Sequence, residues 1–138
     1  MFEEAIRPVW LQVTFMAKIL VIDDDQTILG YFKRIQAKLN CEVAGAADSN
    51  DGCQMAQDPA VKIIIMDFCI PGGLEKTDLL KKLKTLRPEL PVVVISGFST
   101  PAIIDECQKL GASEFLTKPF ELSFLPVIVQ RLLGSAPG

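Results

Sequence analysis

The stretch that decides the fold is Lys18-Ile19-Leu20-Val21-Ile22-Asp23-Asp24-Asp25, in which four apolar residues lead directly into three acidic ones. Residues 19–22 show no alternation of polar and apolar side chains, which is typical of a strand covered on both faces inside a parallel sheet. Open sheets of this kind place their ligands at the carboxyl ends of the strands. Because three adjacent carboxylates repel one another, we expect a hard divalent cation such as Mg²⁺ to offset their charge.

Helical and strand patterns alternate after this stretch. Asp25 is interpreted as the N-cap of a helix over residues 26–39, and we favour this role over metal binding. Further helices are expected near residues 50–57, 75–86, 101–110 and 122–133, and further strands near 41–46, 61–66, 92–95 and 112–117. Five strand–helix repeats with short connections predict a parallel sheet with helices on both faces, which is a doubly wound α/β fold.

The composition narrows the classes of function. The chain has 138 residues, of which 49% are hydrophobic, enough for one domain with a core. Its net charge of −3 disfavours direct nucleic-acid binding, and no apolar run approaches the roughly 20 residues that membrane insertion needs. The absence of histidine excludes catalysis through a histidine base and most zinc sites. Four cysteines without CxxC spacing are interpreted as reduced thiols of a cytoplasmic protein.

The two ends of the chain are set apart from the domain. Met16-Ala17-Lys18 has the form of a natural start, and the acidic residues near the N-terminus make a poor signal peptide. We therefore assign residues 1–16 to an N-terminal extension that need not be native, residues 17–134 to the domain, and residues 135–138 to a tail.

Four of the five predicted strands end at a residue that can take part in chemistry. Asp23 and Asp24 follow the first strand, Asp67 the third, Ser96 the fourth and Lys118 the fifth. Each alone has an ordinary explanation as a turn, cap or solvated loop residue. Because the carboxyl ends of parallel strands share one sheet edge, their joint placement predicts one crevice. Its carboxylates, hydroxyl and ammonium suit phosphoryl transfer onto a carboxylate, with a metal bridging the anionic groups.

With these residues in place, the chain resembles the receiver domain of bacterial response regulators over residues 17–134. The family pattern is an acidic pair after strand one, a phosphoacceptor Asp after strand three, Ser or Thr after strand four and Lys-Pro after strand five. The matching stretches here are KILVIDDD, IIIMDFCIPG, VVVISG and FLTKPF. The resemblance implies a flavodoxin-like, five-stranded parallel sheet with strand order 2-1-3-4-5. One departure is the loop PGGLEKTDLL, which is one residue longer than usual and has Thr77 where a glycine is expected.

The resemblance also implies roles for the residues that meet a phosphoryl group. Asp67 would receive this group from a histidine kinase or a phosphotransfer protein. Mg²⁺ would be held by Asp23, Asp24, Asp67 and the backbone carbonyl of Cys69, and Lys118 would pair with Asp67.

A second set of implied roles concerns signalling. Ser96 would bond a phosphoryl oxygen after transfer, and Phe115 occupies the position of the family's aromatic switch. The surface that changes, and that meets a downstream protein, would be formed by the fourth helix, fifth strand and fifth helix. Because no output domain follows, we expect a stand-alone signalling domain, not an enzyme, that binds a partner or passes the phosphoryl group along a relay.

Two other interpretations remain open at this point. Asp23-Asp24-Asp25-Gln26-Thr27 fits the DxDxT motif of haloacid-dehalogenase-type phosphatases, with Asp23 as nucleophile and Asp25 as acid and base. That interpretation lacks an acidic pair after Lys118 and leaves Asp67 without a role. The second alternative is a receiver-shaped interaction module that is never phosphorylated.

Overall fold

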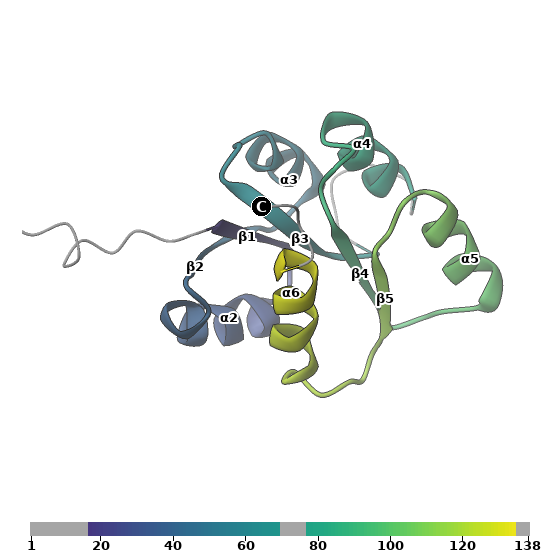
Figure 1. The fold of residues 1–138 in the computed structure, drawn as a ribbon. Coiled ribbons are helices and arrows are strands. Elements are labelled where there is room, and N and C mark those ends of the chain that lie inside the picture. Colours follow the sequence, from purple (N-terminus) through teal and green to yellow (C-terminus); the bar gives the residue numbers. More distant parts are fainter. Residues whose placement is uncertain (1–16, 70–76, 135–138) are drawn as a thin grey trace, which may run out of the picture.

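The computed structural model describes residues 17–69 and 77–134. The elements follow one another as strand and helix (Figure 1). The strands are β1 (Ala17–Ile22), β2 (Cys41–Ala46), β3 (Val61–Asp67), β4 (Val92–Ser96) and β5 (Glu114–Thr117). The helices are α2 (Gln26–Leu39), α3 (Ser49–Ala56), α4 (Asp78–Leu86), α5 (Pro101–Lys109) and α6 (Phe124–Gly134).

The five strands form one parallel sheet in the order β2-β1-β3-β4-β5, which confirms the order that the resemblance implied. The first strand lies near the centre, where Ile19 pairs with Val43 on β2 and with Ile63 on β3. The strand order therefore reverses direction next to β1, and ligand sites of open α/β sheets lie at such a point.

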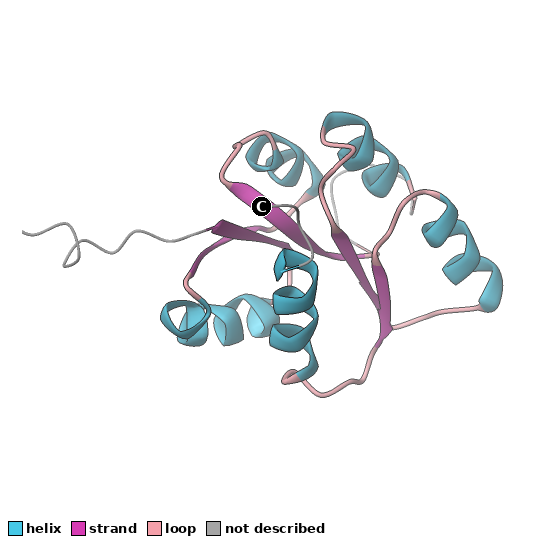
Figure 2. Cartoon of the chain, in the orientation of Figure 1, coloured by secondary structure: helices cyan, strands magenta, loops and turns pink. Residues whose placement is uncertain are grey.

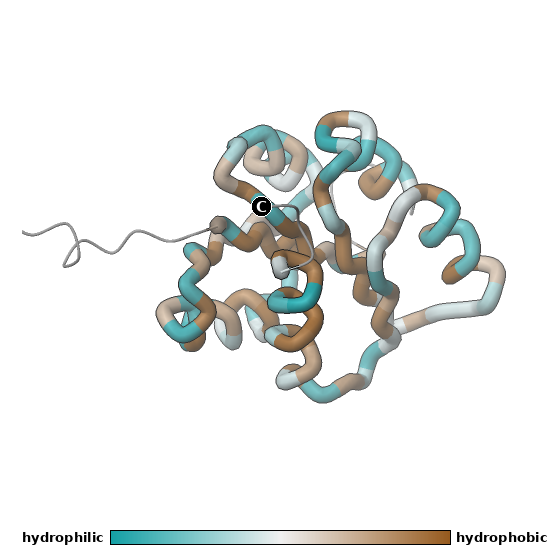
Figure 3. The backbone as a smooth tube through the Cα atoms, in the orientation of Figure 1, coloured by the Kyte–Doolittle hydropathy of each residue, from teal (hydrophilic) through white to brown (hydrophobic). Residues whose placement is uncertain are grey.

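Helices cover both faces of the sheet (Figure 2). Successive strand residues point to opposite faces, so the continuous apolar runs supply two separate cores. One core holds Leu20, Ile64 and Val94 under α3, α4 and α5, and the other holds Ile19, Ile63 and Val93 over α2 and α6. In Figure 3 the strands are mostly hydrophobic and the outer helix faces hydrophilic. The predicted doubly wound α/β fold is confirmed.

Local signals explain most helix boundaries. Asp25 caps α2 as predicted, and its side chain accepts a hydrogen bond from the backbone N–H of Thr27 at 2.9 Å. The helix α3 begins at Ser49 because Asp48 caps it, accepting from the backbone N–H of Asp51 at 2.8 Å. Thr100 caps α5 ahead of Pro101.

Two predicted starts differ from the structure by two residues. The fifth strand begins at Glu114 instead of residue 112, because Gly111 has a φ of 104° and the chain needs two further residues to rejoin the sheet. The last helix begins at Phe124, two residues later than predicted. The predicted start of the third helix at residue 75 and the loop around residues 71–73 lie outside the described residues. Thr77 precedes α4 without a side-chain capping bond.

Across residues 17–69 and 77–134, none of the helices has the length and apolar character that a membrane span requires.

Candidate functional site

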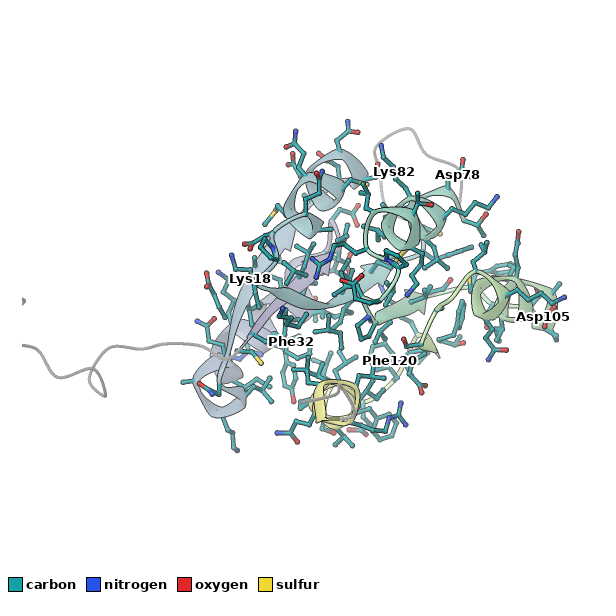
Figure 4. All side chains as sticks on the ribbon, turned by 45° about the horizontal axis from the view of Figure 1, so that its top comes forward. Lys18, Phe32, Asp78, Lys82, Asp105 and Phe120 are labelled. Atoms are coloured by element: carbon teal, nitrogen blue, oxygen red, sulfur yellow. The ribbon has the colours of Figure 1, made fainter. Side chains whose placement is uncertain are left out.

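The predicted site residues lie together at the carboxyl edge of the sheet. Asp23 and Asp24 follow β1, Asp67 is the last residue of β3, Ser96 is the last residue of β4, and Lys118 follows β5. This arrangement follows from parallel pairing, since each strand delivers its last residue to the same edge. By contrast, the charged side chains labelled in Figure 4 on α4 and α5, namely Asp78, Lys82 and Asp105, project from the outer sides of these helices.

Three carboxylates form a cluster that can hold a cation. One oxygen each from Asp23, Asp24 and Asp67 lies within 4.8 Å of the other two. Asp23 is 5% exposed, whereas Asp24 is exposed to solvent. A set of carboxylate oxygens open to water on one side suits a hard cation that keeps part of its hydration shell, as Mg²⁺ does.

The buried environment of Asp23 changes its pKa. Burial raises its pKa to about 6, and the negative charge of Asp67 acts in the same direction. A hydrogen bond of 2.9 Å from the backbone N–H of Asp25 to its Oδ1 and the positive charge of Lys118 oppose this rise. A bound cation would remove the net penalty on the charged form.

Asp67 is held on both oxygens. Its Oδ2 accepts a hydrogen bond of 3.0 Å from the Lys118 ammonium, and its Oδ1 accepts one of 2.8 Å from the backbone N–H of Cys69. The Asp67 side chain is only 12% exposed. Burial acts to lower the pKa of Lys118, but the hydrogen bond and charge of Asp67, together with Asp23, outweigh it and the pKa is raised. Lys118 therefore stays protonated beside the acids.

The Ser96 hydroxyl points into its own loop. Ser96 is fully buried, and its Oγ donates a hydrogen bond to the carbonyl of Phe98 and accepts one of 3.0 Å from the backbone N–H of Phe98. The ring of Phe98 itself is 61% exposed. The hydroxyl is thus at the predicted sheet edge but is not bonded to Asp67.

Phe115 lies between core and surface. It is partly buried against the core under α3, α4 and α5, and its ring meets that of Phe68 edge to face, with centroids 6.4 Å apart. Since Phe68 directly follows Asp67, the ring predicted to be a switch contacts the neighbour of the central carboxylate.

Two features were not predicted from the sequence. A cavity of about 270 Å³ opens beside Asp23 and Lys118, and its other lining residues are Asp25, Thr27, Ile28, Pro119, Phe120 and Leu122. Figure 4 shows Phe120 close to α6, on the side of the sheet that this helix covers. The second feature is a pair of hydroxyls, with Ser99 Oγ and Thr117 Oγ1 2.9 Å apart. The run Lys118-Pro119-Phe120 was a signal for the cavity, but no pattern in the sequence relates Ser99 to Thr117.

Together, fold and site define a doubly wound α/β domain with a cluster of three carboxylates at one sheet edge, in which Asp67 is paired with a lysine. The family described as the response regulator receiver domain matches residues 19–130. The chain therefore belongs to the receiver domains of two-component systems, which are signalling domains.

Named relatives agree with this assignment. The chain is 34% identical over 121 residues to the DNA-binding transcriptional regulator NtrC of Azospirillum brasilense, covering 86% of this chain and 24% of the relative. It is 31% identical over 136 residues to the two-component response regulator ARR8 of Arabidopsis thaliana, covering 83% and 60%. A CheY-like receiver domain structure from Methanospirillum hungatei JF-1 superposes with a TM-score of 0.75 at 27% identity, covering 86% and 95%. The chain thus spans a quarter to three fifths of these two curated relatives.

Proposed function

We propose that Asp67 receives a phosphoryl group from the phosphohistidine of a histidine kinase or phosphotransfer protein, in a reaction that depends on Mg²⁺. The observation that carries this proposal is the environment of Asp67. Its carboxylate accepts a hydrogen bond of 3.0 Å from the ammonium of Lys118 and has an oxygen within 4.8 Å of oxygens of Asp23 and Asp24. An acceptor carboxylate needs both positive charge beside it and a cation site in reach, because the incoming phosphoryl group is itself anionic.

The chemistry assigns a task to each side chain. An oxygen of Asp67 forms a bond to phosphorus while the bond from phosphorus to the imidazole nitrogen of the donor breaks, and the imidazole leaves. Lys118 offsets the charge that collects on the phosphoryl oxygens. Asp23, Asp24, Asp67 and the backbone carbonyl of Cys69 would hold Mg²⁺, which supplies charge neutralisation between acceptor and phosphoryl group.

The position of Ser96 supports a proposed signalling step. A phosphoryl group on Asp67 adds acceptor oxygens at the sheet edge. Ser96 would leave the carbonyl of Phe98 and bond one of them, and the ring of Phe115 would move into the space that opens. The surface formed by α5, β5 and α6 would then change and meet a downstream protein partner.

Trapping the acyl phosphate tests the proposal. A small phosphodonor with Mg²⁺ should label Asp67, which borohydride reduction followed by mass spectrometry locates. The matched control is Asp67→Asn, which should remain unlabelled. Label on Asp23 would favour a phosphatase of the haloacid-dehalogenase type instead, and the absence of any label would favour an interaction module that is never phosphorylated.

One observation weighs against the phosphatase alternative. That mechanism needs the Asp25 carboxylate as a mobile acid and base. Here it caps α2, accepting hydrogen bonds from both the backbone N–H and the hydroxyl of Thr27, and these bonds lower its pKa. The carboxylate is thus committed to the helix and remains ionised, so it is poorly suited to donate a proton.

A further inference from the structure

The loop between β4 and α5 is held at two successive residues. At Phe98, both backbone polar groups bond the hydroxyl of Ser96. At Ser99, the side-chain hydroxyl lies 2.9 Å from the hydroxyl of Thr117, which is the last residue of β5. This second contact joins the loop to a neighbouring strand, 18 residues away along the chain.

Thr117 is a fixed anchor for this contact. It is paired in register with Ser96 across the β4–β5 ladder. The next residue, Lys118, donates its backbone N–H to the carbonyl of Ser96 at 2.8 Å, and its ammonium holds Asp67. The end of β5 is therefore tied to the sheet on one side and to the candidate phosphoacceptor on the other.

The carbonyl of Phe98 and a phosphoryl oxygen on Asp67 would compete for the hydroxyl hydrogen of Ser96. A serine hydroxyl has one hydrogen to donate. In this structure the hydrogen is given to the carbonyl of Phe98, so Ser96 must release that carbonyl before it can donate to a phosphoryl oxygen. The carbonyl of Phe98 then loses its donor and needs a new partner, which water can supply when the loop moves outward.

Ser99 limits this movement. Its Cα is about 3.8 Å from that of Phe98, and its side chain is held by Thr117. As long as the two hydroxyls remain bonded, the peptide groups of Phe98 stay beside Ser96. The pair therefore favours the arrangement in which Ser96 is occupied.

We propose that the Ser99–Thr117 hydroxyl pair is an autoinhibitory latch, which keeps Phe98 bonded to Ser96 and opens when Ser96 turns to a phosphoryl group on Asp67. This inference rests on the proposed function, because it assigns a regulatory contact to the same site. The latch adds a barrier to switching. The two residues that form it belong neither to the acidic cluster nor to its pair with Lys118.

A double-mutant cycle tests the latch. The variants are Ser99→Ala, Thr117→Val and both together, with Ser113→Ala as a control at the residue that directly precedes β5. Each protein is titrated with beryllofluoride, a phosphoryl mimic, in the presence of Mg²⁺. Loss of one hydroxyl bond should tighten beryllofluoride binding by about two- to fivefold in each single variant.

The decisive result is whether the effects of the two single substitutions on beryllofluoride affinity add up in the double variant. Because both single substitutions remove the same bond, the double variant should bind no more tightly than the tighter single variant, while Ser113→Ala should match wild type. Single variants that bind beryllofluoride as weakly as wild type or more weakly, or tightening that adds up in the double variant, would overturn the latch.

Amide hydrogen exchange separates failure of the latch from failure of the proposed function. Without any mimic, opening the latch should speed exchange of the Phe98 amide, which is bonded to Ser96 in the closed loop. If wild-type protein does not bind beryllofluoride at all, the proposed function fails, and Phe98 exchange still decides about the latch. Unchanged exchange in both single variants would contradict it.

Discussion

At the scale of single residues, the acidic cluster is a source of instability in the folded protein. Asp23 is nearly fully buried next to two other carboxylates, and burial raises its pKa to about 6. Lys118 offsets the cost of burying the charged Asp23 only in part, because its hydrogen bond goes to Asp67. Without a cation, the folded protein therefore holds a charged Asp23 at neutral pH against an unfavourable environment.

The unfavourable burial of the charged Asp23 carboxylate predicts that the stability of the protein depends on pH. The folded-state pKa of Asp23 lies above its ordinary value, so between about pH 4 and 6 the folded state binds more protons than the unfolded state. The contribution of Asp23 to the free energy of unfolding therefore decreases as pH rises through this window. Asp23→Asn removes the effect, and at pH 7.5 without metal we expect it to raise the free energy of unfolding by about 1–2 kcal/mol.

Urea unfolding at pH 5, 6, 7 and 8 measures this effect. The difference between Asp23→Asn and wild type should grow from pH 5 to pH 7, and the exposed-site control Glu106→Gln should show no such trend. A stability difference that is constant across the range would contradict the assignment of a raised pKa.

The second residue-scale prediction concerns the metal. Asp24→Ala removes one carboxylate of the cluster, and we expect Mg²⁺ binding to weaken about tenfold or more. Phosphorylation by a small donor should be abolished, and chelating the metal should do the same to the wild type. Isothermal titration with Mg²⁺ measures the first effect. If the variant binds Mg²⁺ and is phosphorylated at the wild-type rate, the ligand assignment is wrong.

At the scale of elements, the site depends on how closely α3 packs on β1. A Cβ atom at Gly52 would lie 2.7 Å from Cδ1 and 3.1 Å from Cγ1 of Ile22. Ile22 is the last residue of β1 and directly precedes Asp23, so a glycine on α3 allows the strand to present its acids in their observed place.

Substitution of Gly52 should show whether its role is to allow close packing of α3 on β1, as opposed to the low helix propensity that any helical glycine has. Gly52→Ala forces α3 or β1 to shift, and we expect a loss of about 1–3 kcal/mol in the free energy of unfolding. The matched control is Gly30→Ala on α2, where the nearest atom to a new Cβ is 3.8 Å away. There alanine should stabilise by about 0.5–1 kcal/mol, because glycine is a poor helix residue. Chemical denaturation of both variants provides the test, and equal effects of one sign would refute the packing argument.

At the scale of the whole molecule, a chain of contacts joins the acidic cluster to the surface formed by α5, β5 and α6. Phe68 follows Asp67, donates its backbone N–H to the carbonyl of Ile95 at 2.7 Å, and meets Phe115 through its ring. Ile95 precedes Ser96 on β4, so Phe68 links the end of β3, where Asp67 lies, to the end of β4 and to the candidate switch ring on β5. A change at Asp67 can thus reach β5 without unfolding any element.

Beryllofluoride with Mg²⁺ should make this connection visible. We expect amide chemical shifts to change at residues around Asp67 and also across residues 103–115, because burial of a large apolar ring contributes about 1–3 kcal/mol, enough for a population shift of tenfold or more. Two-dimensional amide NMR with and without the mimic measures this. Shifts confined to the neighbourhood of Asp67 would mean that Phe115 is a static core residue.

Prediction from sequence succeeded where the signal is periodic or lies at a strand end. All five strands were predicted, and β1, β3 and β4 were predicted from continuous apolar runs. The acids, the serine and the lysine predicted the site edge that Asp23, Asp67, Ser96 and Lys118 share. It was less accurate at the start of β5 and α6, because a residue such as Gly111 indicates that an element ends nearby but not how many loop residues follow. The strand order came from family resemblance, since alternation alone is compatible with several orders.

The sequence by itself thus determined the alternating fold and the collection of its chemically active side chains at one edge, because parallel strands leave only one edge for their carboxyl ends. Only the tertiary structure decided how these groups are bonded. It turned the Ser96 hydroxyl toward Phe98, joined Ser99 to Thr117, and placed Lys118 on one oxygen of Asp67 and a backbone N–H on the other. The physical reason is that such contacts depend on loop conformation and on the register between neighbouring strands, and neither leaves a repeating pattern in the chain.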